Sequence, residues 1–257
     1  MGKALPFSSV DSYFKGLGES IPGCIVDTNF LIAATYENHP FFDDAEFLFG
    51  KLADYQIPVY STVTTRAEFI DFRRRIIITE VLMDMMSSTS PWKLSKIAHQ
   101  ELKKHRTWID LQASKEELPI LTDARIKQCK SVFMPVTQSG KSGWVEICKH
   151  YLTGTMQASW NLVVEKLGTN HLDLNEAEAQ KLILNKVEWK KMYEISEATC
   201  LGSSDAMLLN MLDCSVFPFV ASADYDLAYS VLVHSPDKTI LIPDSLYRNR
   251  IKGKRFS

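Results

Sequence analysis

Residues 22–31 read PGCIVDTNFL, and this stretch decides the fold that we expect. The Pro-Gly pair punctuates the chain, and the apolar run Cys24–Val26 that follows ends at an acidic residue, Asp27. A short apolar run with these boundaries predicts a buried strand that carries the acid at its carboxyl end. The chain then turns into Phe30–Ala34, which begins a helix or an irregular turn.

Strands and helices alternate at both ends of the chain. Gln56–Tyr60 predicts a second strand, and Ser61 or Thr62 is expected to cap a long helix that runs through Glu68 to about Met86. The C-terminal part predicts helix, strand, helix and strand, with Ser203 or Ser204 capping the first helix: Asp205–Leu212, Phe217–Ser222, Asp224–Leu232 and Thr239–Ile242. This alternation predicts an α/β fold, a three-layer α/β/α sandwich with a parallel central sheet.

The middle of the chain predicts helices: Leu94–Ile109, Asp123–Phe133, Trp144–Leu167 and a last one from Asn175 to about Ala198. No fixed-period repeat and no low-complexity linker divides the chain into independent halves. We therefore expect a single domain over residues 1–257, with its core at about 22–86 and 175–245. A helical insertion is expected at about 90–172.

Composition limits the class of protein. An apolar fraction of 46% and a charged fraction of 23% are typical of a soluble globular chain, and the net charge of −2 gives no global bias toward nucleic acid. Because no run of about 18 apolar residues occurs, we expect no transmembrane helix and no membrane partner. The five cysteines are scattered and odd in number, so free thiols and a cytoplasmic location are expected.

Four acidic residues stand where the predicted sheet would place reactive groups. In open parallel sheets these groups gather beyond the carboxyl ends of the strands. Asp27 and Asp224 each follow a predicted strand, Glu68 lies on the second turn of a helix, and Asp205 lies on the first turn of another. We therefore expect the four carboxylates to converge on one rim of the sheet.

Such a group of carboxylates needs a cation. Two carboxylates about 4 Å apart repel by roughly 4 kcal/mol at an effective dielectric constant near 20. Oxygen ligands favour Mg²⁺ or Mn²⁺ over zinc, and these ions activate water against a phosphodiester. We expect Asp27 to bridge and the other acids to bind terminally or through water, while Asn29 and Ser222 orient Asp27 and Asp224.

The segments that hold these acids resemble the four motifs of PIN-domain ribonucleases. Residues 24–31 resemble the opening strand of that family, and residues 61–69 its second motif, in which a strand leads into a helix with a Glu. Residues 204–209 resemble the third motif and residues 220–227 the fourth. The resemblance covers about residues 22–86 and 175–245. The 137 residues from Glu68 to Asp205 exceed what compact family members need.

The resemblance implies a function and a set of site residues. Asp27, Glu68, Asp205 and Asp224 would be the catalytic, metal-binding acids, with Asp226 as a fifth ligand. The activity would be that of a Mg²⁺- or Mn²⁺-dependent endoribonuclease acting on RNA, as in toxin members of toxin–antitoxin pairs or in RNA-processing members. An antitoxin-type inhibitor protein and a homodimer are the candidate partners.

Simpler interpretations stay open. Asp205 taken alone reads as a helix-capping acid and Asp226 as a first-turn acid. Arg66 and Arg73 are candidate phosphate contacts, or they belong to a solvated helix face. The rival functions are a catalytically inactive PIN-like scaffold that binds RNA or protein, and a structure-specific DNA nuclease. Five tryptophans read as packing anchors of the helical middle, although exposed ones could stack on single-stranded bases: Trp92, Trp108, Trp144, Trp160 and Trp189.

Overall fold

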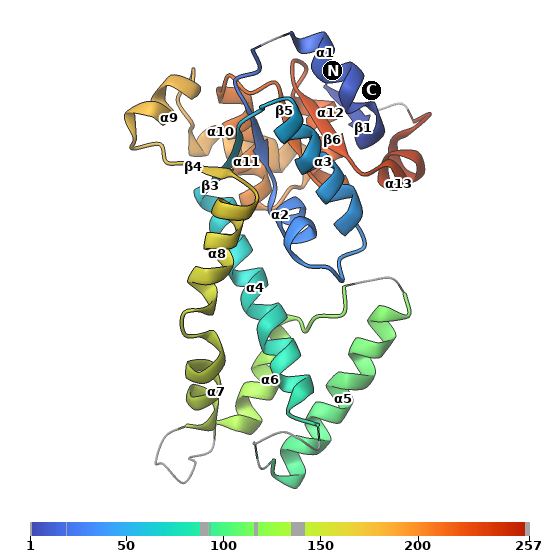
Figure 1. Ribbon diagram of the computed structural model, residues 1–257, viewed down its shortest axis with the longest axis vertical. Coiled ribbons are helices and arrows are strands. Elements are labelled where there is room, and N and C mark those ends of the chain that lie inside the picture. The colour runs from blue at the N-terminus through green and yellow to red at the C-terminus, as the bar shows by residue number, and fades with distance from the viewer. Residues whose placement is uncertain are drawn as a thin grey trace. The chain divides into compact units, whose positions relative to one another are not determined.

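The computed structural model describes residues 2–18, 20–87, 92, 94–115, 118–134 and 142–254. The chain divides into two compact units. The first comprises Met1–Phe69 and Leu162–Ser257, and the second comprises Ile70–Asn161 (Figure 1). The sequence placed the helical insertion at about 90–172, whereas the second unit begins at Ile70 and ends at Asn161, so both of its bounds lie earlier in the chain.

A parallel sheet forms the centre of the first unit. Within the described residues it has six strands in the order β1-β6-β5-β2-β3-β4, and every neighbouring pair is parallel. Their bounds are β1 (Lys3–Pro6), β2 (Cys24–Val26), β3 (Val59–Thr62), β4 (Thr169–Leu172), β5 (Phe219–Ala221) and β6 (Thr239–Ile242). The predicted α/β class and parallel sheet are confirmed.

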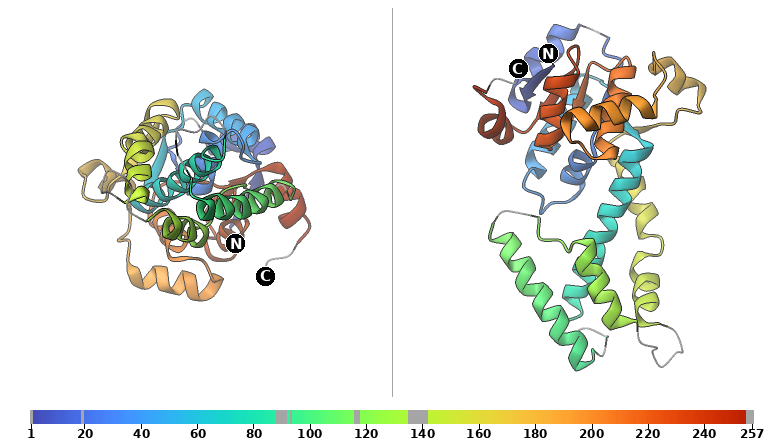
Figure 2. Two further views of the ribbon diagram at one scale, coloured as in Figure 1. Left: turned by 90° about the horizontal axis from the view of Figure 1, so that it is seen from below. Right: turned by 180° about the vertical axis from the view of Figure 1, so that it is seen from behind.

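Helices cover both faces of this sheet, which makes the first unit a three-layer sandwich. One face carries α1 (Val10–Leu17), α2 (Thr28–Thr35) and α3 (Phe42–Asp54), and the other carries α10 (Trp189–Thr199), α11 (Ser203–Cys214) and α12 (Tyr225–His234) (Figures 1 and 2). Successive side chains of β5 point to opposite faces of the sheet, so this strand packs against both layers of helices. Phe219 packs on Phe14, with 5.4 Å between ring centroids, whereas Val220 joins the apolar cluster of α10, α11 and α12.

The strand order creates a switch point at the centre of the sheet. β2 lies between β3 and β5, so the chain leaves β2 toward one edge and later returns to its other side. In open α/β sheets a crevice forms at such a point, beyond the carboxyl ends of the strands. Gly23 fixes the start of β2. Its φ is +136° and the Pro58 carbonyl oxygen would lie 2.7 Å from an added Cβ, so this position admits only glycine.

The second unit is helical in its described part and has its own core. α4 (Val63–Asp84) begins in the first unit, and α5 (Lys96–Ala113), α6 (Asp123–Phe133) and α7 (Gly143–Leu152) follow, before α8 (Thr155–Lys166) returns to the first unit. Leu82, Leu102 and Ile147 are fully buried members of this core. The prediction of a helix at Asp123–Phe133 is confirmed.

Several predicted elements differ from the structure. The single helix expected over Trp144–Leu167 is wrong, because Gly154, at φ +77°, separates α7 from α8. The helix expected from Asn175 is likewise two helices, α9 (Ala177–Leu182) and α10. The edge strands β1 and β4 were not predicted. Edge strands have a neighbour on one side only, and β4 mixes exposed polar residues with buried ones, so neither shows a continuous apolar run.

The structure also bears on two predictions from composition, the absence of a transmembrane helix and the free cysteines. Among the helices that the structure describes, none is both long and apolar enough to cross a bilayer. All five cysteines are free, as expected, and Cys24, Cys129 and Cys214 are buried. Cys200 is exposed, on a left-handed turn at φ +60° that ends α10.

Candidate functional site

Asp27 lies at the switch point of the sheet. It follows β2 directly, its backbone amide donates to the Ala221 carbonyl of β5 at 3.0 Å, and only 1% of its surface is exposed. The side chain is therefore fixed between the two central strands. A carboxyl in such a position has little access to bulk water, so its charge depends on the groups around it.

Ser222 links Asp27 to Asp224. Its hydroxyl donates to Asp27 Oδ2 at 2.5 Å and accepts from the Asp224 backbone amide at 2.9 Å. Ser222 is itself fully buried, one residue beyond β5. The residue that the sequence proposed as an orienting group thus contacts both acids that follow the central strands.

Asp224 is fixed from two sides. Its Oδ1 accepts from the amides of Asp226 at 2.6 Å and Leu227 at 3.4 Å, which makes Asp224 the N-cap of α12. Its Oδ2 accepts from Asn29 Nδ2 at 3.2 Å. Asn29 also donates its backbone amide to Asp27, an interaction that lowers the pKa of Asp27. Asn29 and Ser222 therefore each touch both Asp27 and Asp224.

Glu68 joins this group through Thr28. The Thr28 hydroxyl donates to Glu68 Oε2 at 2.8 Å, and Thr28 immediately follows Asp27 in the chain. The start of α4 is fixed by the hydroxyl of Thr62, which accepts from the Thr65 amide at 3.1 Å, so the predicted capping by Thr62 is confirmed. Thr28 was not named from the sequence, although its place beside Asp27 in the strand motif was the available signal.

Asp205 is connected to the group by charge. It lies in the first turn of α11, whose N-cap is Gly202, so the expected capping by Ser203 or Ser204 is wrong. The pKa of Asp205 is raised to about 6, first by burial and then by the charges of three other acids: Glu68, Asp224 and Asp226. Asp205 therefore lies within electrostatic reach of acids from α4 and α12.

The pKa of Asp27 shows the same mutual repulsion. The pKa of Asp27 is raised to about 7, mainly by burial and also by the charges of Asp205 and Asp224, while the hydrogen bonds from Ser222 and Asn29 oppose the rise. Exposure increases away from Asp27: Glu68, Asp205 and Asp224 are half-buried and Asp226 is exposed. Acids from four distant segments are thus coupled by charge or hydrogen bonds, with the most buried of them, Asp27, at the centre of the sheet.

The carboxylates are linked to one another by hydroxyl and amide groups. Among the described side chains, no set of three or more His, Cys, Asp or Glu is placed to hold a metal ion. The oxygens of Asp27, Glu68 and Asp224 accept the hydrogen bonds given above. The donor set around the crevice consists of oxygen atoms, which are the ligands that Mg²⁺ and Mn²⁺ prefer.

The two arginines proposed as substrate contacts belong to different units. Arg66 lies in the first unit with the acids. The pKa of His171 is lowered mainly by burial and also by the charge of Arg66, so the two side chains lie near each other. Arg73 lies in the second unit, where its charge acts on Glu80. The structure brings only Arg66 of this pair into the same compact unit as the acids.

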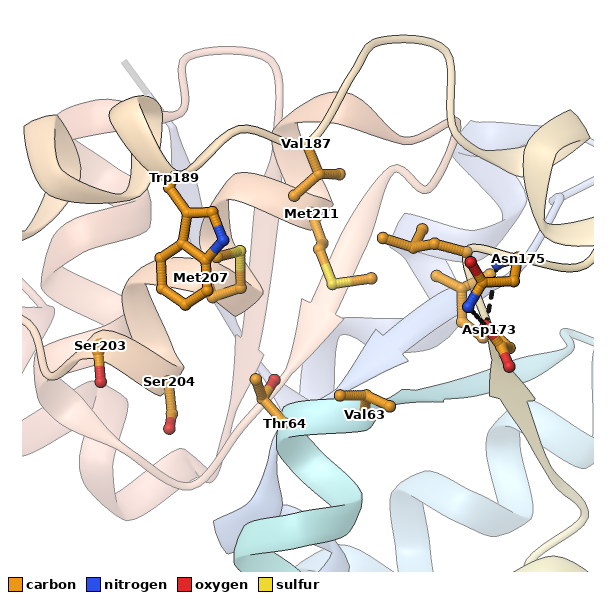
Figure 3. A pocket seen from close by; sticks show the side chains of 12 residues that line it. Val63, Thr64, Asp173, Asn175, Val187, Trp189, Ser203, Ser204, Met207 and Met211 are labelled. Atoms are coloured by element: carbon orange, nitrogen blue, oxygen red, sulfur yellow. Dashed lines mark hydrogen bonds between the residues drawn. The ribbon is translucent and has the colours of Figure 1, made fainter.

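A cavity of about 310 Å³ in the first unit is lined in part by residues that lie close in the chain to two of these acids. Ser204, which precedes Asp205, lines it, as does Thr64, one helical turn before Glu68 (Figure 3). Trp189 forms part of its wall and is 64% exposed. From the sequence, Trp189 was expected to be a packing anchor of the helical middle, whereas it begins α10 in the first unit. No sequence pattern predicted the cavity.

The raised pKa of Asp27 predicts how stability depends on pH. In metal-free buffer the folded protein binds a proton at Asp27 up to about pH 7, whereas the unfolded chain releases it near 3.8. The folded state thus binds more protons between these values, so the free energy of unfolding falls as the pH rises through them. At about pH 7 the ionisation of Asp27 should lower the free energy of unfolding by on the order of 3–4 kcal/mol, and Asp27→Asn should remove this loss.

Urea denaturation in EDTA at several pH values measures this effect. The difference in unfolding free energy between Asp27→Asn and the wild type should shift in favour of the variant as the pH rises from about 4 to about 7. Parallel curves over this range would show that Asp27 is ionised at an ordinary pKa in the folded protein.

Comparisons with known proteins add no relative. No protein-family model matches the chain, and no curated protein or solved structure is significantly similar to it. Any function assigned to the chain therefore depends on the residues and geometry described above.

Proposed function

We propose that the first unit is a PIN-like, metal-dependent nuclease, an endoribonuclease that hydrolyses phosphodiester bonds of RNA. One observation carries this proposal. Carboxylates from four distant segments are joined by hydrogen bonds and charge near the carboxyl ends of β2 and β5. Asp27, Glu68, Asp205 and Asp224 are the proposed catalytic acids.

A divalent cation accounts for the clustering of these acids. Burial and like charges both oppose ionisation of Asp27 and Asp205, so the folded protein stabilises neither carboxylate by itself. A scaffold that only binds a partner has no need for such repulsion. An ion bound among these oxygens would favour the charged forms and recover the lost stability.

The residues present fit Mg²⁺ or Mn²⁺. Mg²⁺ keeps several water ligands and is held by one or two carboxylates together with substrate phosphates, so a shared cage of three side chains is not required. Asp27 and Asp205 would hold the ion, with Glu68, Asp224 and Asp226 acting directly or through water. When bound, such an ion lowers the pKa of water and neutralises the charge that develops on the phosphate.

The remaining polar groups hold the acids in position. Ser222 orients Asp27, Asn29 orients Asp224, and Thr28 orients Glu68, each through a hydrogen bond given above. Arg66 would contact a substrate phosphate and offset the negative charge of the crevice. RNA as substrate, an antitoxin-type inhibitor, a homodimer and a cytoplasmic location come from the resemblance to PIN-domain ribonucleases and the composition.

Cleavage of a substrate panel tests the proposal. Single-stranded RNA, duplex RNA, single-stranded DNA and flapped DNA are incubated with the protein in Mn²⁺ and in EDTA. Manganese-dependent cleavage of RNA is the expected result. Preferred cleavage of flapped DNA would identify a structure-specific DNA nuclease, and intact substrates throughout would leave the scaffold as the function.

Ser222→Ala should weaken Mn²⁺ binding by about 10–100-fold, because outer groups that orient metal ligands have effects of this size. The change removes the hydroxyl that donates to Asp27 and accepts from Asp224. Isothermal titration calorimetry with MnCl₂ measures the Mn²⁺ affinity of the variant and of the wild type.

Ser215→Ala is the matched control for Ser222→Ala. Ser215 is also buried and also makes two hydrogen bonds, donating to the Leu212 carbonyl at 2.8 Å and accepting from the Phe217 amide at 3.3 Å. It lies beyond the C-terminus of α11, whereas Asp205 is near the N-terminus. Equal losses of Mn²⁺ affinity in the two variants would remove the orienting role of Ser222.

A further inference from the structure

The cavity beside the acids has an apolar wall and a polar rim. Trp189, Val187, Met207 and Met211 line it from one side, and Val63 of α4 lies opposite Val187 (Figure 3). Its volume of about 310 Å³ is at the lower end of the range of roughly 300–1,000 Å³ found for small-molecule sites. A flat apolar group of the size of a single ring system is the kind of ligand that this space admits.

Trp189 is placed to stack on such a ring. It is the first residue of α10, and its indole borders the cavity while 64% of the residue is exposed. Tyr193, one turn along the helix, lies beside it with 6.4 Å between ring centroids and is 55% exposed. A large aromatic residue left exposed at the edge of a cavity provides a stacking surface that folding has not used.

The polar rim suits the edge of a nucleobase. Thr64, Ser203 and Ser204 are among the residues that line the cavity, and each carries a hydroxyl group (Figure 3). A hydroxyl both donates and accepts, so it can serve any of the four bases. Asp173 is fixed on the far side by Asn175, whose backbone and side-chain amides each donate to Asp173 Oδ1 at 2.9 Å.

The position of the cavity connects it to the proposed catalytic acids. Ser204 is adjacent to Asp205 in the chain, and Thr64 precedes Glu68 by one turn of α4. Part of the lining of the cavity and two of the proposed acids come from the same N-terminal turns of α4 and α11. The cavity and the acids would thus bind neighbouring parts of one strand.

A second cavity extends the path away from the acids. It has a volume of about 380 Å³ and shares Leu174 and Val187 with the first cavity. Gln180, Asn185 and Lys186 line it, and these side chains can donate to phosphate oxygens. Because the two cavities share lining residues, a strand with a base in the first could place its next phosphate at the polar residues of the second.

We propose that the first cavity binds an unpaired base of a single-stranded nucleic acid, stacked on Trp189, next to the phosphate held at the acids. This inference rests on the proposed nuclease function for the identity of the strand. A paired base is sequestered in a helix and cannot enter the cavity, so the site selects single-stranded substrate.

Binding of a charge-matched pair of oligonucleotides tests the proposal. The probes are a single-stranded RNA hexamer and an abasic hexamer with the same number of phosphates, each fluorescein-labelled and titrated by anisotropy in EDTA. Base stacking on an aromatic residue changes affinity by about 5–150-fold per base. The wild type should prefer the full hexamer by such a factor, and Trp189→Ala should lose the preference.

Two further variants make the result specific. Trp189→Phe keeps an aromatic ring and should retain most of the preference. Phe47→Ala removes another exposed aromatic residue, 45% exposed on α3 and outside the cavity lining, and should leave the preference unchanged. Equal binding of both hexamers by the wild type, or an unaltered preference in Trp189→Ala, would overturn the proposal.

The test separates this inference from the proposed function. Binding is measured in EDTA, so it does not depend on cleavage. If the panel shows no cleavage while Trp189 still determines base-dependent binding, the nuclease is wrong and the base site stands. If RNA is cleaved, Trp189→Ala should raise KM and leave kcat unchanged, because stacking binds ground state and transition state alike. Unchanged KM would remove the base site alone.

Discussion

Asp205→Asn is expected to lower Mn²⁺-dependent cleavage by more than about 100-fold, since loss of orienting groups alone costs about 10–100-fold at metal sites. The substitution keeps the size of the side chain and removes the charge that couples to Glu68, Asp224 and Asp226. The initial rate on the RNA that the wild type cleaves best measures this effect.

The same variant should lose the stabilisation that Mn²⁺ gives the wild type. An ion at about 100 times its Kd stabilises the folded state by about 2.7 kcal/mol. Removing one carboxylate also relieves repulsion, so metal-free Asp205→Asn should be at least as stable as the wild type at neutral pH. Melting curves with and without Mn²⁺ give both quantities.

Asp213→Asn is the matched control for Asp205→Asn. Asp213 is on the same helix, eight residues further along, and burial raises its pKa as well. The charges around it are those of His234, Lys238 and Lys191, so it belongs to a different environment. If both variants lost cleavage to the same extent, or if Asp205→Asn cleaved like the wild type, the proposed role of Asp205 would be refuted.

Phe219→Ala should reduce the free energy of unfolding by about 3–5 kcal/mol, the range found when a buried Phe is cut to Ala. Phe219 is fully buried on β5, with its ring centroid 5.4 Å from that of Phe14 and 5.7 Å from that of Tyr13. A loss of this size is a large part of the roughly 5–15 kcal/mol that stabilises a typical domain.

Urea denaturation measures this loss, and Phe47→Ala serves as its control. Phe47 is 45% exposed on α3, and surface substitutions usually change stability by less than about 0.5 kcal/mol. Because β5 leads into Ser222 and Asp224, Mn²⁺ affinity should also fall in Phe219→Ala as its first unit loosens. Similar stability in the two Phe variants would show that the α1 layer does not depend on Phe219.

The central strands were predictable because their side chains are apolar and their ends are marked. Cys24–Val26 and Thr239–Ile242 are strands as predicted. Both are buried throughout, and a buried strand reads as a continuous apolar run. The edge strand β4 contains exposed Asn170 beside buried Thr169, and a four-residue mixture of this kind carries no periodic signal.

The connections around the acids could be predicted only in part. Asn29 and Ser222 were named because each stands two residues from an acid in the motifs of the sequence. Their double contacts with Asp27 and Asp224 depend on β2 and β5 being neighbours, and about 200 residues of chain separate these strands. The contact between Thr28 and Glu68 depends in the same way on the pairing of β2 with β3.

The sequence by itself determined the α/β class, the central strands and the acids at their carboxyl ends. The reason is that the apolar character of a segment and the turn-forming residues that bound it are local properties of the sequence. Only the tertiary structure decided the strand order, the raised pKa values of Asp27 and Asp205, and the cavity at Trp189. Desolvation, repulsion between charges and the shape of a cavity arise from groups that lie far apart along the chain. These three effects arise only when folding brings those groups together.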